Sequence, residues 1–200
     1  MNQYARQNVT HRELSRRQWL AQWLTRWLGI ALAAATLPAR AGDELERQIK
    51  AAFLYRFGGF VEWPEGAFAR ADSPLVIGVF GADALAEQLE RLVAGRTVNG
   101  RIVQVQRLNA APGAGRAAHI AFIGGAGGAA AQGLLDGCRA QPILTVSDNG
   151  QVHGMGSVIN FLVVDERLRF EVSLKAAAAA RLRISARLLA AAYRVQPGAA

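Results

Sequence analysis

Four short apolar runs, separated by segments of helical character, constrain the fold of this chain more than any other feature. The runs lie at residues 74–80, 101–108, 117–123 and 142–146. The intervening segments 84–94 and 129–138 are predicted to be helices, and the first of them repeats leucine at helical spacing. Because parallel strands need long crossover connections, usually helices, this order predicts a sheet covered by helices. The run 101–108 alternates apolar and polar residues, which favours a half-exposed strand toward an edge.

The C-terminal third predicts a change of topology. Residues 157–164 and 167–174 flank Asp165 and Glu166, a pattern typical of an antiparallel hairpin. The alanine-rich segment 175–180 and the segment 184–195 predict two closing helices. Together these elements predict an α/β protein: a three-layer α/β sandwich with a mixed sheet, a C-terminal β-hairpin and closing helices.

A segment dense in aromatic rings, KAAFLYRFGGFVEWP, occupies residues 50–64. Helical spacing predicts a helix over 43–57, weakened at Gly58 and ended by Pro64. The rings expected to pack on the sheet are Phe53, Phe57, Phe60 and Trp63. Charged side chains are dispersed among the rings and do not form one basic face, so direct membrane insertion is disfavoured.

The first 41 residues have the anatomy of an export signal: a basic stretch, an apolar run at 28–37, and a small-x-small cleavage site ending at Ala41. Residues 15–20 (SRRQWL) fit either a twin-arginine export motif or an ordinary secretory basic region, and both interpretations stay open. Cleavage leaves one domain, 42–200. It removes six of the 23 basic residues and one of the 15 acidic ones, and the net charge falls from +8 to +3. A balance that mild predicts no binding to nucleic acid.

A glycine-rich loop follows the third apolar run. Gly125, Gly127 and Ala130 have the spacing of a dinucleotide-binding fingerprint, and Asp148 follows the next strand, where an acid would bind a ribose hydroxyl. The loop comes late in the chain and in a Gly/Ala-rich context, which favours a flexible strand-to-helix connection without cofactor. Nucleotide binding is the alternative.

No catalytic or metal-binding set is evident. His119 is expected at a strand end, satisfied by backbone groups, and His153 in a glycine-rich turn. Ser147 and Asp148 could be read as a nucleophile beside an acid, but adjacent strand residues point to opposite faces. The two residues are therefore expected to cap a turn. The single cysteine, Cys138, is expected to be buried in a helix and cannot form an internal disulfide.

Two charged residues allow either a purely structural or a functional interpretation. Glu171 fits a solvated strand face, or a charge used for docking a partner. Arg183 fits a helix start, or a planar guanidinium offered to an anionic ligand or a partner carboxylate.

An ordered set of short segments resembles the YfiR family of exported regulators. The segments are 50–55 (KAAFLY), 60–64 (FVEWP), 100–101 (GR), 119–123 (HIAFI), 144–148 (LTVSD), 156–161 (GSVINF), 170–172 (FEV) and 182–189 (LRISARLL). The resemblance implies a periplasmic protein, often dimeric, that restrains a membrane-bound diguanylate cyclase by binding its periplasmic sensory domain. Cyclic di-GMP, and with it biofilm behaviour, would be controlled from outside the cytoplasm.

The same resemblance implies roles for particular residues. Glu171 matches a glutamate linked to partner binding, and Arg183 matches an arginine lining a small-ligand pocket. Glu62 and Trp63 match the loop at the mouth of that pocket. Ser185 stands where some relatives have a histidine, and Glu62 where some have an arginine.

The family's cysteines are replaced here. Ala118, His119 and His153 occupy the neighbourhoods in which family members commonly form disulfides. Redox control through a disulfide is therefore expected to be absent.

The sequence thus favours a non-enzymatic periplasmic regulator that acts by protein binding, without cofactor. A periplasmic small-molecule or nucleotide-binding protein, or an enzyme, is the alternative.

Overall fold

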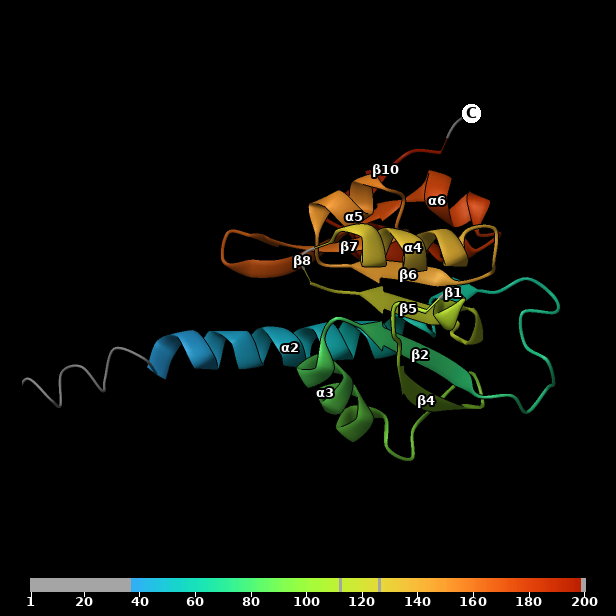
Figure 1. Cartoon of the computed structure of the whole chain (residues 1–200), viewed down its shortest axis with the longest axis horizontal. Coiled ribbons are helices and arrows are strands. Elements are labelled where there is room, and N and C mark those ends of the chain that lie inside the picture. The colour runs from blue at the N-terminus through green and yellow to red at the C-terminus, as the bar shows by residue number, and fades with distance from the viewer. Residues whose placement is uncertain (1–36, 112, 126, 199–200) are drawn as a thin grey trace, which may run out of the picture. The chain divides into compact units, whose positions relative to one another are not determined.

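The computed structural model describes residues 37–111, 113–125 and 127–198 (Figure 1). The chain divides into two compact units, 1–45 and 46–200. In the first, the described residues 37–45 form the beginning of helix α2; the second carries the sheet. The predicted export signal, residues 1–41, falls outside the described residues except for 37–41.

The elements follow the predicted alternation and add several short strands. In chain order they are α2 (Leu37–Phe57), β1 (Val61–Glu62), β2 (Leu75–Phe80), α3 (Asp83–Val93), β3 (Thr97–Val98), β4 (Arg101–Arg107), the 3-10 helix η1 (Ala114–Ala117), β5 (Ile120–Ile123), α4 (Ala129–Cys138), β6 (Leu144–Ser147), α5 (Gly150–Gly154), β7 (Ile159–Val164), β8 (Arg167–Ser173), α6 (Leu174–Ala179), β9 (Arg183–Ile184), α7 (Ala186–Ala191) and β10 (Arg194–Gln196).

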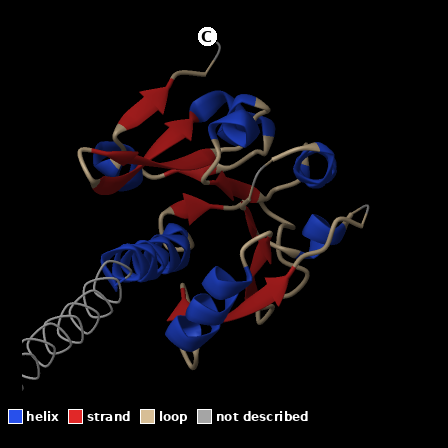
Figure 2. Ribbon diagram, turned by 60° about the vertical axis from the view of Figure 1, so that its left-hand side comes forward, coloured by secondary structure: helices blue, strands red, loops and turns tan. Residues whose placement is uncertain are grey.

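Eight strands form one mixed sheet in the order β10-β8-β7-β6-β5-β2-β4-β3. The strands from β4 to β7 pair in parallel, β7 and β8 form the predicted antiparallel hairpin, and β10 joins β8 in parallel. Helices lie on both sides of the strands (Figure 2). The predicted three-layer α/β sandwich with a mixed sheet is confirmed.

Strand β5 shows how the two outer layers are attached. All four of its residues are fully buried. Successive side chains point to opposite faces. Ile120 and Phe122 belong to the core shared with α2 and α3, whereas Ala121 and Ile123 belong to the core shared with α4 and α5. A continuous apolar run is therefore the expected pattern for this central strand.

The aromatic segment packs inward, as predicted. The rings of Phe53 and Phe57 on α2 lie 5.4 Å from Phe170 on β8, and 6.0 and 5.9 Å from Phe161 on β7. These separations are typical of stacked and edge-to-face aromatic pairs. The four rings attach α2 to the hairpin.

Helix α2 ends where the glycine pair begins. A Cβ atom at Gly58 would come within 2.6 Å of the Leu75 side chain, so glycine permits the close approach of the helix end to β2. Phe60 and Trp63 lie beyond the helix and are half-buried against the same core.

The structure corrects three local predictions. Strand β5 begins at Ile120, not at Ala117, because the preceding residues form η1. His153, predicted in a glycine-rich turn, lies in helix α5, which Asn149 caps by accepting a hydrogen bond from the Gln151 amide at 2.8 Å. The single closing helix over 184–195 is also wrong, because β9, α7 and β10 replace it.

Phe57→Ala should lower the free energy of unfolding by about 3–5 kcal/mol, since it removes a fully buried ring from the attachment of α2. Ile102→Ala is the matched control, because Ile102 is 61% exposed and its loss should cost less than about 0.5 kcal/mol. Urea unfolding measures both. Equal effects of the two substitutions would contradict the packing described here.

Candidate functional site

A two-stranded sheet brings together the four residues predicted to bind a ligand. Strands β1 and β9 pair antiparallel, with Glu62 opposite Arg183. The Arg183 Nε atom lies 3.6 Å from the Glu62 carboxylate, and both side chains are largely exposed. Such an exposed ion pair contributes little stability. Arg183 lies in a strand, so its interpretation as a helix start is wrong.

Ser185 and Trp63 flank this pair. The Ser185 amide donates to the Phe60 carbonyl at 2.9 Å, and its hydroxyl accepts from the Leu188 amide at 3.3 Å. Ser185 therefore caps α7 and ties it to the chain before β1. The indole Nε1 of Trp63 is buried and has no hydrogen-bond partner within the described part of the protein. A buried donor without an acceptor is costly, and a ligand oxygen would satisfy it.

An aromatic stack lies beside Trp63. The ring of Phe68 stacks on the ring of His119, with their centroids 4.2 Å apart. The guanidinium of Arg101 lies 3.8 Å from the centroid of the same Phe68 ring. His119 Nδ1 accepts a hydrogen bond from the Val76 amide at 3.1 Å, which confirms its predicted backbone satisfaction. Burial lowers the pKa of His119, a hydrogen bond with the Ala67 backbone raises it, and the charge of Arg101 lowers it further.

A cavity of about 420 Å³ opens next to this stack. Its lining includes His119, Arg116, Arg181 and the loop from Pro64. None of the four predicted ligand residues lines it, although Pro64 directly follows Trp63. Of the four predicted ligand residues, only Trp63 has a direct chain neighbour in the lining, so the walls of this cavity come from other residues.

Glu171, the predicted partner-binding residue, is buried. It is 8% exposed, so its interpretation as part of a solvated strand face is wrong. One carboxylate oxygen accepts a hydrogen bond from Asn160 Nδ2 at 3.1 Å. The same oxygen lies 3.8 Å from His153 Nε2, and the other lies 3.7 Å from Arg194.

A chain of buried hydrogen bonds connects His153 to Glu171. The Ser157 hydroxyl lies 3.1 Å from His153 Nδ1 and 3.1 Å from the Ser147 hydroxyl, which donates to Asn160 Oδ1 at 3.0 Å. Gln196 Nε2 lies 3.1 Å from His153 Nε2. Because an amide NH₂ group only donates, this contact assigns the histidine proton to Nδ1, which then donates to Ser157.

Serine, histidine and a carboxylate thus meet, but not as a hydrolase triad. Ser147 and Ser157 are fully buried, so no substrate carbonyl can reach either hydroxyl. His153 contacts Ser157 through Nδ1, whereas a triad histidine faces its serine through Nε2 and the acid through Nδ1. The network is therefore suited to fixing α5 against β7 and β8, and sequence reasoning missed it because His153 was assigned to a turn.

Burial lowers the pKa of His153, and this effect outweighs the attraction of Glu171 and a hydrogen bond with the Ser157 backbone, which raise it. Burial also raises the pKa of the Cys138 thiol to about 11, so this cysteine is a weak nucleophile. Cys138 is 3% exposed and lies in α4, as predicted.

The glycine-rich loop and the acid that follows β6 are held by other residues of the protein. Asn149 Nδ2 donates to the Gly125 carbonyl at 3.1 Å. The Asp148 carboxylate lies 2.8 Å from Lys50 Nζ, and Lys50 also pairs with Glu46 at 2.7 Å. Lys50 thereby connects α2 to the end of β6 and engages the carboxylate that a ribose would need.

Two further properties bear on function. Among residues 37–111, 113–125 and 127–198, no helix is both long and apolar enough to cross a bilayer. In the same part of the chain, no group of three or more His, Cys, Asp or Glu side chains is placed to hold a metal ion.

The lowered pKa of His153 predicts a pH-dependent stability. Below the unfolded-state value of 6.5 the unfolded chain binds protons more readily than the folded one, so the free energy of unfolding should fall as the pH drops from 7.5 to 5. His153→Gln should flatten part of this dependence in urea unfolding, leaving the part due to His119. An unchanged slope in the variant would contradict the assignment.

Comparison with known proteins identifies the family of the chain. No curated protein matches the sequence. A solved structure, described as a conserved domain protein from Vibrio cholerae O1 biovar eltor str. N16961, is 12% identical with a TM-score of 0.46; the alignment covers 61% of this chain and 55% of that one. The chain thus spans about half the length of that protein. Residues 47–193 match the family described as YfiR/HmsC-like (DUF4154), and the chain belongs to this family.

Proposed function

We propose that this protein is a periplasmic regulator that binds the sensory domain of a membrane-bound diguanylate cyclase and lowers cyclic di-GMP. The observation that carries the proposal is the family match over residues 47–193, which includes the whole main sheet except β10. Export would remove residues 1–41, and mass spectrometry of the periplasmic protein would identify Gly42 as its first residue. The proposed activity is binding, without catalysis or cofactor.

The contact surface we propose lies at the β10 edge of the sheet. Among the described residues, strand β10 pairs only with β8, which leaves its other backbone edge open to a partner. Tyr193 is 49% exposed and Val195 is 36% exposed, so apolar side chains accompany the open edge. An open edge strand can accept a strand from a partner, and exposed aromatic residues favour binding.

Glu171 acts on this surface through Arg194. The two residues are opposite each other in the β8–β10 pairing, and the Arg194 guanidinium lies 3.7 Å from the Glu171 carboxylate. Glu171 is too buried to be a principal contact, whereas Arg194 is largely exposed. In this proposal Glu171 positions the arginine, and Arg194 meets the partner.

The small-ligand alternative has one favourable observation, the unpartnered Trp63 indole beside a cavity of about 420 Å³. Thermal-shift measurements with dinucleotides and small carboxylates test it, because a ligand specific for the folded state raises the melting temperature.

Crosslinking in the native periplasm, followed by mass spectrometry, should identify the sensory domain of a diguanylate cyclase as the partner. Deletion of the gene should raise cyclic di-GMP, and expression of the wild-type chain should restore it. A crosslinked partner unrelated to cyclic di-GMP enzymes, with unchanged cyclic di-GMP, would refute the proposal.

Arg194→Ala should weaken binding to the purified sensory domain by about tenfold, because charged contacts near an interface centre carry much of the affinity. Glu171→Gln should weaken it less, since the amide oxygen still accepts from Asn160 while the attraction for Arg194 is lost. Arg167→Ala, at the tip of the hairpin, is the matched control. Calorimetry measures affinity, and circular dichroism should be unchanged in all three. Equal affinities for Arg194→Ala and the control would exclude this surface.

A further inference from the structure

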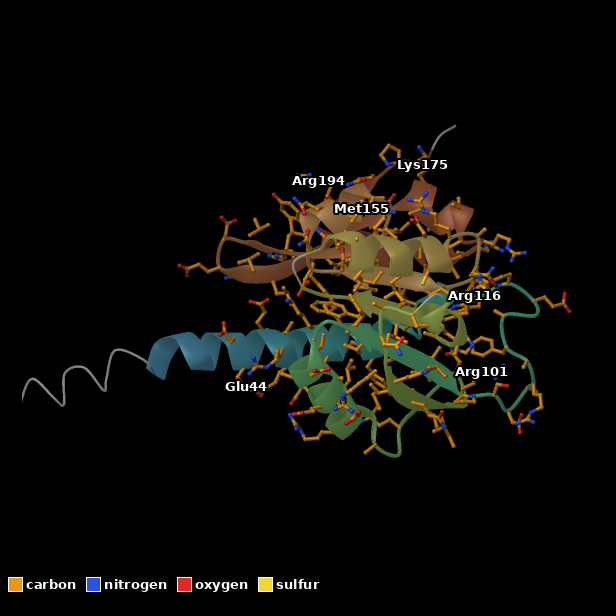
Figure 3. All side chains as sticks on the ribbon, in the orientation of Figure 1. Glu44, Arg101, Arg116, Met155, Lys175 and Arg194 are labelled. Atoms are coloured by element: carbon orange, nitrogen blue, oxygen red, sulfur yellow. The ribbon has the colours of Figure 1, made fainter. Side chains whose placement is uncertain are left out.

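A second cavity, of about 570 Å³, lies among the C-terminal elements, and none of the roles considered above uses it. Pockets for small molecules usually span about 300–1,000 Å³. Its walls come from the end of α4, the start of β6, the end of α5, and α6. Met155 and Lys175, two of its lining residues, lie at this end of the domain in Figure 3. It shares only Ile143 with the cavity beside Trp63.

Nine of the seventeen residues that line this cavity are apolar. The apolar lining residues are Leu135, Cys138, Ala140, Ile143, Met155, Val158, Ala176, Ala179 and Ala180. Leu135, Ile143 and Val158 are branched aliphatic side chains, and the one ring in the lining is the imidazole of His153, which is 9% exposed. An aliphatic body fits such a surface better than a flat base or an aromatic ring.

The charges on the lining have one sign. Lys175 and Arg139 line the cavity, and no carboxylate does. Arg139 is already engaged, with Asp136 at 3.0 Å and the Met155 carbonyl at 3.0 Å. Lys175, within the described part of the chain, has no ion-pair or hydrogen-bond partner. One ammonium group is therefore available to an anion.

The remaining polar groups at the inner wall are neutral and mutually satisfied. His153 is 9% exposed, and its two ring nitrogens contact Ser157 and Gln196. The Thr145 hydroxyl accepts from the Val158 amide at 3.0 Å. The inner wall thus offers no second strong anion site, and the charge of a ligand belongs at the Lys175 side.

We propose that this cavity binds a small aliphatic monocarboxylate, with the carboxylate at Lys175 and the hydrocarbon chain against the α4, β6 and α6 walls. A charge-assisted hydrogen bond to the ammonium fixes the head group. Burial of the chain supplies the affinity. A single free lysine selects for a monoanion, and the cationic lining excludes amines.

Octanoate is the probe, with octan-1-ol and octylamine as matched controls of the same chain length. Calorimetry and thermal shift on the mature protein should show saturable binding of octanoate and a raised melting temperature. Lys175→Met should weaken octanoate binding about fivefold or more, and Lys175→Arg should retain it. Comparable binding of octan-1-ol, no binding of octanoate, or equal affinities of the Met and Arg variants would overturn the proposal.

Ala179→Phe localises the site, because Ala179 is an exposed lining residue and a ring there would occupy the cavity. Octanoate binding should be lost in this variant, while circular dichroism and the melting temperature without ligand should stay close to wild type. Retained binding in a folded Ala179→Phe variant would place octanoate elsewhere and refute the assignment.

Discussion

The packing of two phenylalanines from α2 against two from the β7–β8 hairpin determines much of the remaining structure. Phe161 and Phe170 are opposite each other in the hairpin and face α2. Since neighbouring side chains alternate across a strand, Asn160 and Glu171, the next opposed pair, must face the other layer. The aromatic contact on one face of the sheet therefore buries a carboxylate on the other, and the protein must satisfy it there.

The hydrogen-bond chain from Glu171 to His153 meets that requirement and links two surfaces. Glu171 faces Arg194 at the start of β10, while His153 contacts Gln196 at its end. Gln196 and His153 also line the larger cavity. Strand β10 thus contributes to both proposed sites: Arg194 to the partner surface and Gln196 to the lining of the carboxylate pocket. The cavity and the proposed surface are therefore connected through residues of the same strand, Gln196 and Arg194.

Local patterns predicted most of the fold and misjudged Glu171 for a physical reason. In β8, alternation places Arg167, Arg169 and Glu171 on one face, and the first two are indeed exposed near the hairpin tip. Glu171 is covered because α5 lies over that end of the strand, a contact between distant segments that periodicity cannot reveal. The two-residue strands β1 and β9 were missed likewise, since only their mutual pairing defines them.

The cysteine content of this chain limits how it can respond to oxidation. Cys138 is the only cysteine, and its burial keeps the thiol protonated, so no disulfide can form within the chain. His153 holds α5 through hydrogen bonds with Ser157 and Gln196. Hydrogen bonds exchange with ligand and water, unlike a covalent crosslink. The contacts of His153 that hold α5 are therefore hydrogen bonds, and none of them depends on a disulfide.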